Sequence, residues 1–182
     1  MYFYALKYSM NKAEIFFQSI SPEQLTTNFI HAIGDEWMLI TAVSKIGFNT
    51  MTASWGAAGV LWNKPIAICF VRSTRYTYEF IDKADIFTLS FFNETYRKLL
   101  NYCGSNSGRN VDKIKETGLK PIATLHDGIT FEQAKLCLEC KKIYYDDLKP
   151  GNFLIPKTDT AFYPKKDYHR MYIGEIINCL VR

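Results

Sequence analysis

Small polar residues, glycines and arginines gather at three places where the sequence predicts the end of a strand or the start of a helix. These places are residues 49–55 (NTMTASW), 72–77 (RSTRYT) and 103–109 (CGSNSGR). Arginine can form a forked pair of hydrogen bonds to a phosphate, and a Gly/Ser-rich loop can offer several backbone N–H donors to an anion. Together these residue types predict a site for a phosphorylated ligand.

The first stretch is extended, but its composition differs from that of a buried strand, which is built mainly from Val, Ile and Leu. Hydroxyls and backbone groups beside the flat ring of Trp55 would suit the polar edge of a planar ligand. An edge strand with one polar face would have the same composition, so this stretch alone does not distinguish a ligand site from an ordinary edge strand. The candidate residues are Asn49, Thr50, Met51, Thr52, Ala53, Ser54 and Trp55.

The other two stretches each precede a predicted helix. Helix N-termini and the loops before them bind anions, although ordinary helix capping explains either loop taken alone. Arg72 or Arg75 could fork onto a phosphate in the first loop, and Arg109 and Lys113 are the cations of the second. The candidates are Arg72, Ser73, Thr74, Arg75, Tyr76 and Thr77, followed by Cys103, Gly104, Ser105, Ser107, Gly108, Arg109 and Lys113.

The C-x-x-C spacing of Cys137 and Cys140 raises the possibility of zinc or a redox pair. Apolar and polar residues alternate around them, which predicts a strand, and residues three apart on a strand lie roughly 10 Å apart on opposite faces. A disulfide needs Cα atoms within about 7 Å, and zinc would need a second ligand pair. We therefore predict no metal site, with Cys140 in the core and Cys137 facing outward.

Composition narrows the class of protein. The 182 residues suit one domain, which we place at 21–182 after an N-terminal extension at 1–20. The net charge of +4 is spread along the chain, so a nucleic-acid partner is not expected. The longest apolar runs are shorter than the roughly 18 residues that a membrane-spanning helix needs. The number of cysteines is odd, which does not suit the disulfide framework of a secreted protein. These features predict a cytoplasmic protein without a membrane partner.

The remaining pattern predicts mostly strands. A helix is expected at 21–34, capped by Ser21 and ended by Gly34; a hairpin turns at Gly47 between strands 37–44 and 50–55. Further strands are expected at 65–72, 86–92, 128–131, 134–145 and 168–181, with short helices at 74–85, 94–103 and 111–118 and a long excursion at 146–167. Strands in succession favour a mainly β fold, a β-barrel with short peripheral helices.

The order of these segments resembles that of a known family. Five segments succeed one another as in the flavin reductase-like proteins with an FMN-binding split β-barrel, above all the flavoredoxin-type branch. The segments are NTMTASWG, PIAICFVRSTRYTYEFI, FTLSFF, CGSNSGRNVDKIKETG and YHRMYIGEI. The resemblance extends over about residues 20–182. It implies FMN as cofactor, with the flavin ring along Thr50–Trp55, the ribityl chain and phosphate at Arg72–Thr77, and the Cys103–Lys113 loop closing the site.

The resemblance also implies a redox function. The expected protein takes hydride from NADH or NADPH, or electrons from a redox partner protein, and passes them to flavin or a small acceptor. Two alternatives stay open: an electron-carrier module that binds FMN without turning over NAD(P)H, and a dimeric scaffold that has lost its flavin. Members of the family commonly form homodimers, so a second chain is expected at each pocket.

Three residues carry sharper hypotheses. Trp55 either borders the flavin ring or packs at the dimer interface. His169 opens the last predicted strand, where related flavin reductases have a histidine near the flavin or nicotinamide; the alternative is a surface histidine bonded to the excursion. Cys103 either faces the flavin with a pKa lowered near Arg109 or is a small buried packing residue.

Overall fold

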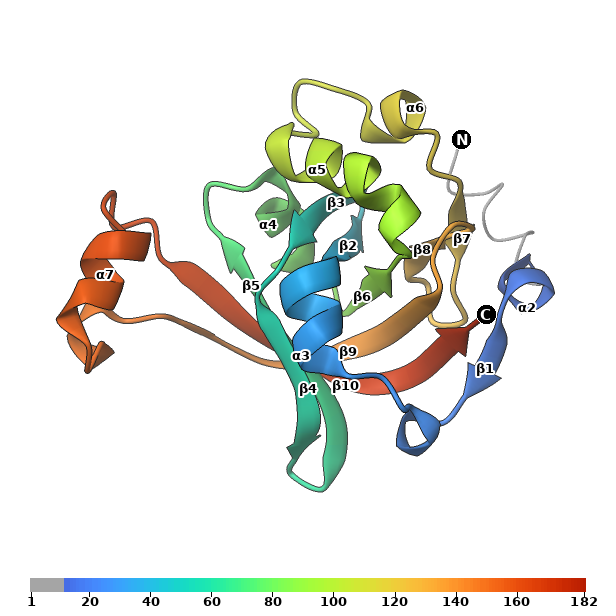
Figure 1. Cartoon of the computed structure of the whole chain (residues 1–182), viewed down its shortest axis with the longest axis horizontal. Helices are drawn as coiled ribbons and strands as arrows, with labels where there is room; N and C mark the ends of the chain where they lie inside the picture. Colours follow the sequence, from blue (N-terminus) through green and yellow to red (C-terminus); the bar gives the residue numbers. More distant parts are fainter. Residues whose placement is uncertain (1–11) are drawn as a thin grey trace.

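The computed structural model describes residues 12–182, and most of its strands belong to one antiparallel sheet (Figure 1). The hydrogen-bonded order is β3-β2-β6-β9-β10-β5-β4, with β1 joined to the far end of β10, and β7 and β8 form a separate pair. The strands are β1 Gln18–Ile20, β2 Met38–Ser44, β3 Gly47–Ala53, β4 Gly56–Leu61, β5 Lys64–Arg72, β6 Ile86–Phe91, β7 Pro121–Ala123, β8 Ile129–Phe131, β9 Leu136–Asp147 and β10 His169–Val181. The expected mainly β fold is confirmed.

Short helices lie around this sheet (Figure 1). They are α2 Lys12–Phe16, α3 Phe29–His31, α4 Tyr76–Ile81, α5 Arg97–Ser105, α6 Lys113–Thr117 and α7 Pro156–Phe162. The main core packs α4 against the inner sheet face, with Ile40, Phe87 and Tyr172 among its buried side chains. The predicted helices at 74–85, 94–103 and 111–118 therefore exist. α4 and α6 are shorter than their sequence patterns, whereas α5, with the 3₁₀ turn Glu94–Tyr96 before it, continues to Ser105.

The hairpins follow local turn chemistry. Gly47 has a φ of +125°, which only glycine adopts without strain, and it joins β2 to β3 where the sequence predicts a turn. Strand β4 was missed, because its GAAG sequence has low strand propensity. Trp62 and Asn63, both with positive φ, turn β4 back onto β5.

The predicted helix at 21–34 begins at Ser21 and Pro22 as expected, but it is not continuous. Pro22–Gln24 forms a single 3₁₀ turn, in which the Ser21 N–H donates to Gln24 Oε1 at 2.9 Å. The chain then runs extended to Asn28, whose side chain caps α3, and Gly34 lies inside a π-helical turn at Ala32–Glu36 instead of ending the helix. The two adjacent threonines at 26 and 27 disfavour a continuous helix, because β-branched residues lose side-chain freedom there.

A second cluster of buried residues covers the other face of β9. Cys137 belongs to it, together with Phe92, Leu100 and Phe131, and is fully buried. The prediction that Cys137 faces outward is therefore wrong, because α5 and the β7–β8 pair cover this side of the sheet. All five cysteines are buried and free.

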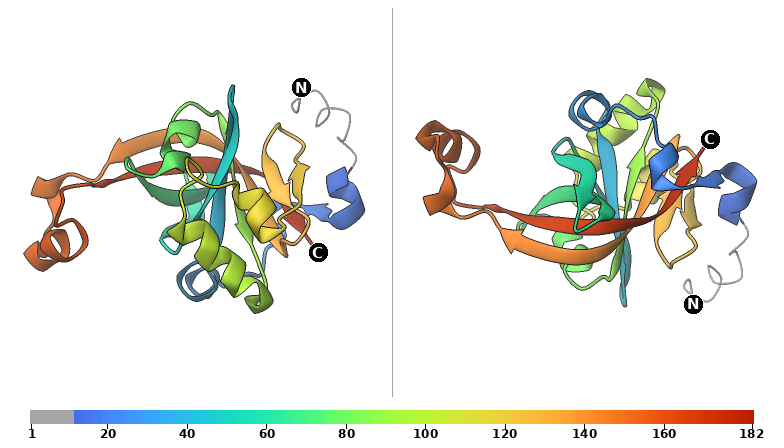
Figure 2. Two further views of the ribbon diagram at one scale, coloured as in Figure 1. Left: turned by 90° about the horizontal axis from the view of Figure 1, so that it is seen from above. Right: turned by 90° about the horizontal axis from the view of Figure 1, so that it is seen from below.

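Strands β9 and β10 extend beyond the barrel as a two-stranded arm. The excursion between them carries α7, which was not expected from the sequence, and α7 lies at the outer end of this arm in all views (Figures 1 and 2). The Leu148 N–H donates to the His169 carbonyl at 3.0 Å where the arm opens. The position of His169 is therefore tied to the base of the excursion.

Strand β1 lies beside the C-terminal end of β10, at the side of the sheet away from the arm (Figure 1). Within the predicted extension at 1–20, β1 pairs with β10, and Ser19 lies opposite Leu180. The first eleven residues of that extension lie outside the described residues. Among the helices that the structure describes, none is long and apolar enough to cross a membrane.

Candidate functional site

The three polar stretches converge at one side of the barrel. The Asn49 side-chain amide on β3 donates to Thr77 Oγ1 on α4 at 2.7 Å. Arg75, the residue before α4, donates from Nη1 to the Gly104 carbonyl at 2.9 Å. Segments separated by tens of residues are thus hydrogen-bonded to one another, and the sequence-predicted grouping corresponds to one place in the structure.

Local sequence explains how these elements end here. The Arg75 N–H donates to the Arg72 carbonyl at 3.0 Å and closes the turn that leads from β5 into α4. Gly104 and Ser105 belong to the last turn of α5, not to a loop as the sequence suggested, and the loop begins at Asn106. Asp112 then caps α6 by accepting hydrogen bonds from the N–H groups of residues 114 and 115.

Lys113 is a buried cation at the centre of this region. Its Nζ donates to the Thr50 carbonyl at 2.8 Å and to the Cys103 carbonyl at 2.7 Å, so it ties β3 to α5. Burial lowers the pKa of Lys113 to about 8, and the positive charge of Arg75 acts in the same direction. Lys113 therefore keeps its proton at neutral pH, and a nearby anion would stabilise that charged form.

A small cavity of about 110 Å³ opens between the converging segments. It is well below the 300 Å³ or so that a drug-sized ligand needs, so its size suits one small group of a larger ligand. Side chains and backbone of all the predicted stretches line it: Asn49, Met51, Thr74, Arg75, Tyr76, Thr77, Ser105, Asn106, Ser107, Gly108 and Lys113. Seven of these eleven residues carry a cationic or hydroxyl group.

Gly108 is required by the packing of this cavity wall. A Cβ placed there would collide with Asn49 Oδ1 and lie 3.2 Å from Tyr76 Cδ1. The Asn49 side chain cannot simply turn aside, because its amide is bonded to Thr77. Glycine at this position is thus explained by the close approach of the loop to β3.

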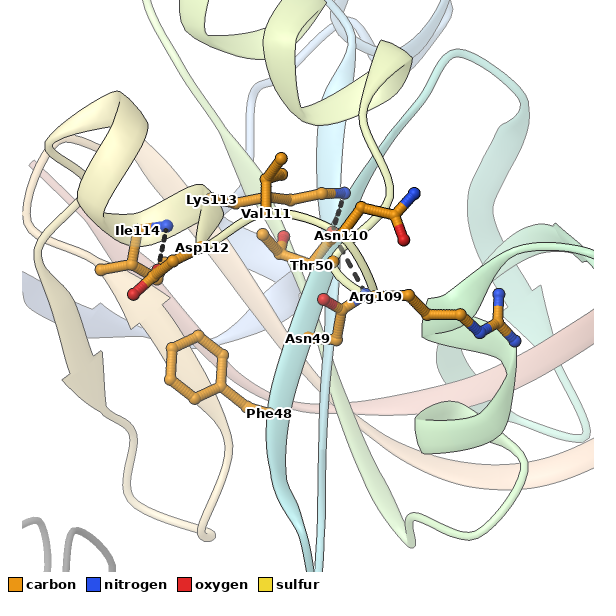
Figure 3. A pocket seen from close by; sticks show the side chains of 10 residues that line it. Phe48, Asn49, Thr50, Arg109, Asn110, Val111, Asp112, Lys113 and Ile114 are labelled. Carbon is orange, nitrogen blue, oxygen red and sulfur yellow. Dashed lines mark hydrogen bonds between the residues drawn. The ribbon is translucent and has the colours of Figure 1, made fainter.

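A larger cavity of about 410 Å³ adjoins the small one and shares Asn49, Gly108 and Lys113 with it. Figure 3 shows the Lys113 side chain reaching toward Thr50, while the Arg109 side chain extends away from the other labelled residues. Arg109 pairs with Glu79 and lies over the Tyr76 ring, 4.8 Å from its centroid. Its charge is therefore partly compensated.

Arg72 is likewise paired with a carboxylate. Its Nη1 lies 2.7 Å from Asp167 Oδ2 and its Nη2 donates to the Phe162 carbonyl at 2.9 Å, so it holds the excursion. This hydrogen bond from Arg72 lowers the pKa of Asp167. Within residues 12–182, Arg75 and Lys113 have no carboxylate partner, which leaves them as the cations best placed to meet an anion.

An aromatic group borders the site on the excursion side. The Trp55 ring is 40% exposed and lies 5.0 Å from the His169 ring and 5.4 Å from the Phe162 ring, between centroids. Burial, reinforced by Arg72, lowers the pKa of His169 to about 4, so this imidazole is neutral at pH 7. His169 is buried and is not a surface histidine, although its partner, Tyr163, does come from the excursion.

Trp55 also lines an apolar cavity of about 460 Å³. The cavity runs from α3 to β4 and β5, and its lining includes Phe29, Ile33, Ser54 and Phe70. Its volume lies within the range of pockets for small organic ligands. The indole of Trp55 thus borders both this apolar cavity and the neutral His169.

The family model described as "Flavin reductase like domain" matches residues 30–182 of this sequence. The chain belongs to this flavin reductase-like family. Among solved structures, the flavoredoxins of Methanosarcina acetivorans and Desulfovibrio vulgaris (Miyazaki F) are each 24% identical to it, with TM-scores of 0.62 and 0.63. They align with 81% and 80% of this chain and with 68% and 69% of their own lengths.

An FMN-binding protein from Thermus thermophilus, 18% identical, has a TM-score of 0.65 over 91% of this chain and 82% of its own. At these identities the solved structures establish a shared fold, the split barrel. The search of curated proteins gave no match.

Not every candidate residue of this flavin reductase-like chain lines a cavity. Ser73 is exposed, and Thr52 donates its hydroxyl to the Leu100 carbonyl. Cys103 is 1% exposed, and burial raises its pKa to about 11 against the opposing charge of Lys113, so it is a packing residue and not an activated thiol. Within residues 12–182, no cluster of three His, Cys, Asp or Glu side chains could hold a metal ion.

Sequence reasoning missed three residues at this site. Asn106 lines the small cavity, Phe162 packs on Trp55, and Tyr163 bonds to His169. Asn106 lies inside the recognised loop motif and could have been included. Phe162 and Tyr163 could not, because nothing in the sequence shows that the excursion folds back onto Trp55.

Proposed function

We propose that this protein is an FMN-binding oxidoreductase of the flavin reductase type. It takes hydride from NADH or NADPH, or electrons from a protein donor, and passes them to flavin or to a small acceptor. The observation that carries the proposal is the small cationic cavity built by β3, α4, α5 and α6, together with the family to which the chain belongs. Related structures, such as that of the FMN-binding protein of Thermus thermophilus, support FMN as the cofactor.

The residues of the site fit the parts of FMN. Arg75, Lys113 and the hydroxyls of Thr74 and Ser107 would hold the phosphate in the small cavity, since charge-assisted bonds to phosphate oxygens are the strongest available there. The ring would lie along Thr50–Trp55, with Trp55 at its border. When bound, the flavin supplies the hydride and electron chemistry itself. The chain's own contribution is to position it and to keep water from its ring.

A second candidate function is an electron-carrier module that binds FMN without reacting with a nicotinamide. The two flavoredoxins among the similar structures favour this alternative. The two candidates predict different kinetics. Under the second, NADH and NADPH reduce the bound flavin no faster than they reduce free FMN.

The test combines spectroscopy with rapid kinetics. The purified protein is expected to show flavin absorption between about 350 and 500 nm, or to acquire it on titration with FMN. A protein that stays colourless and binds no added FMN would contradict both candidates. Anaerobic stopped-flow mixing with NADH and then NADPH separates them, because accelerated reduction supports the reductase and its absence supports the carrier.

A homodimer is part of this proposal. Leu154 and Ile155 on the excursion are 95% and 67% exposed, and Phe162 is 49% exposed, which is unusual for apolar residues grouped on a projecting arm. A second copy of the chain would cover them. Sedimentation analysis should give a dimer that the double change Leu154→Asp/Ile155→Asp dissociates, whereas Leu125→Asp, at an exposed site on the β7–β8 turn, leaves it intact. A monomeric wild-type protein would contradict the proposal.

We also place the protein in the cytoplasm. All five of its cysteines are free, which suits a reducing compartment. Cell fractionation tests this placement, and absence of the protein from the soluble fraction would contradict it.

A further inference from the structure

A buried tyrosine from the excursion contacts His169. Tyr163 follows α7 directly, is 2% exposed, and its hydroxyl lies 2.8 Å from His169 Nδ1. His169 is itself only 9% exposed. The two side chains therefore form a buried pair whose shared hydrogen bond fixes the orientation of both.

The direction of this bond follows from burial. If Nδ1–H donated, the hydroxyl hydrogen of Tyr163 would be buried without an acceptor in the described chain, which is unfavourable. Tyr163 therefore donates and Nδ1 accepts. A neutral imidazole carries one hydrogen, so the His169 hydrogen lies on Nε2. The lowered pKa of His169 agrees with a neutral ring at pH 7.

Packing holds Tyr163 in the position from which it donates. Its ring lies 4.9 Å from that of Tyr168 and 5.7 Å from that of Phe153, between centroids. The Arg72 guanidinium lies 5.1 Å from the Tyr163 centroid while it pairs with Asp167. The hydroxyl consequently has little freedom to leave His169.

The other ring nitrogen is available to a ligand. Among the described residues, His169 Nε2 has no hydrogen-bond partner, and the ring lies beside Trp55 at the border of the candidate site. The charged groups that act on this imidazole are Arg72, Arg75 and Asp167. A neutral N–H donor beside two cations suits a carbonyl-type oxygen, which carries only partial negative charge.

We propose that Tyr163 is a positioning residue that holds His169 as the Nε2–H tautomer, so that His169 donates a hydrogen bond to a carbonyl-type oxygen of the ligand bound beside Trp55. The oxygen belongs either to the flavin ring or to a nicotinamide carboxamide, which have the same acceptor chemistry. The identity of the ligand rests on the proposed function. The tautomer does not, since it follows from the contacts within the chain.

The test uses histidine labelled with ¹⁵N in the cofactor-free protein. The chain has three histidines, so the two-bond ¹⁵N–¹H spectrum is simple and His169→Gln assigns the signal. We expect a protonated Nε2 and an unprotonated Nδ1 in the wild type. In Tyr163→Phe both tautomers should be populated, so that the ¹⁵N chemical shifts of the two ring nitrogens move toward their average. The control is Tyr168→Phe, which removes a hydroxyl bonded to Asp159 from the same aromatic cluster. An Nδ1–H tautomer in the wild type, or an unchanged tautomer in Tyr163→Phe, would overturn the assignment.

Ligand titration of the labelled protein tests the donor role. A shift of the His169 Nε2 signal on adding FMN identifies a flavin oxygen, and a shift only after further addition of NAD⁺ identifies the carboxamide. Binding of both molecules without any shift would overturn the donor role. Failure to bind FMN would contradict the proposed function instead, and the tautomer result would stand apart from it.

Discussion

At the scale of single residues, close contacts decide which side chains this site tolerates. The cavity wall at Gly108 leaves no room for a methyl group, and the ammonium of Lys113 is bonded to two backbone carbonyls. Neither constraint concerns the ligand directly. Both fix the shape and charge of the cavity that we propose for the phosphate.

The change Gly108→Ala should weaken FMN binding by about tenfold, because the added methyl group displaces Asn49 and breaks its bond to Thr77, a loss of about 1.5 kcal/mol. Fluorescence titration with FMN measures the effect. Gly59→Ala is the matched control, since a Cβ at Gly59 meets nothing within 4 Å. Equal FMN affinities for the two variants would show that the cavity wall does not need this glycine.

The change Lys113→Met should lower the free energy of unfolding by about 1–3 kcal/mol, because two carbonyls inside the protein lose their donor. Urea unfolding measures this. Lys115→Met on the same helix is the control: Lys115 is exposed, so its loss should alter stability by less than about 0.5 kcal/mol. If Lys113→Met were as stable as the wild type, the tie between β3 and α5 would contribute nothing.

At the scale of elements, a buried carboxylate joins the β7–β8 pair to the main sheet. Glu139 on β9 is fully buried and accepts hydrogen bonds from Thr124, from the His126 N–H at 2.9 Å and from Asn178 at 3.3 Å. Asn178 in turn accepts a hydrogen bond from Ser19 on β1 at 2.6 Å. Glu139 thus connects β9 to the β7–β8 turn and to β10, and Asn178 continues these bonds to β1.

The change Glu139→Gln should therefore cost about 2–4 kcal/mol of stability, because an amide nitrogen replaces one of the acceptor oxygens and meets donors. Unfolding in urea measures the loss, and amide hydrogen exchange should show faster opening of residues 121–131 first. Glu132→Gln, whose carboxylate only meets Lys120 at the surface, is the control and should change stability by less than about 1 kcal/mol. Equal exchange rates in Glu139→Gln and wild type would contradict this role.

At the scale of the whole molecule, the fold keeps His169 neutral and thereby makes stability depend on pH. The folded pKa is about 4 and the ordinary value is 6.5, so between these values the unfolded chain binds a proton that the folded chain excludes. Unfolding is therefore favoured as pH falls through this window. Above pH 6.5 both states are neutral, and the effect vanishes.

Between pH 7 and pH 5, wild-type protein should lose about 1–2 kcal/mol more stability than His169→Gln, which has no proton to bind at this position. Urea unfolding of both proteins at the two pH values gives the difference directly. The carboxylates and the two other histidines are common to both proteins, so their contributions to the pH dependence of stability cancel in this difference. An identical loss in the two proteins would mean that His169 is accessible to protons in the folded state.

The sequence by itself determined the local features of this protein. Gly47 and Gly118 end elements through their backbone freedom, the alternating pattern around Cys140 gives β9, and the polar stretches mark strand and helix ends. The order of these segments also identified the family, which the family model confirms over residues 30–182. Such features depend on neighbours within a few residues, so they can be read from the chain.

Only the tertiary structure decided what covers each element. Cys137 is buried because α5 and the β7–β8 hairpin pack over β9, and Arg72 is paired because the excursion brings Asp167 to it. The bond between Tyr163 and His169 likewise depends on how the arm folds back beside Trp55. Burial and charge pairing depend on how whole segments pack together, and local propensity carries no information about which of their residues will meet.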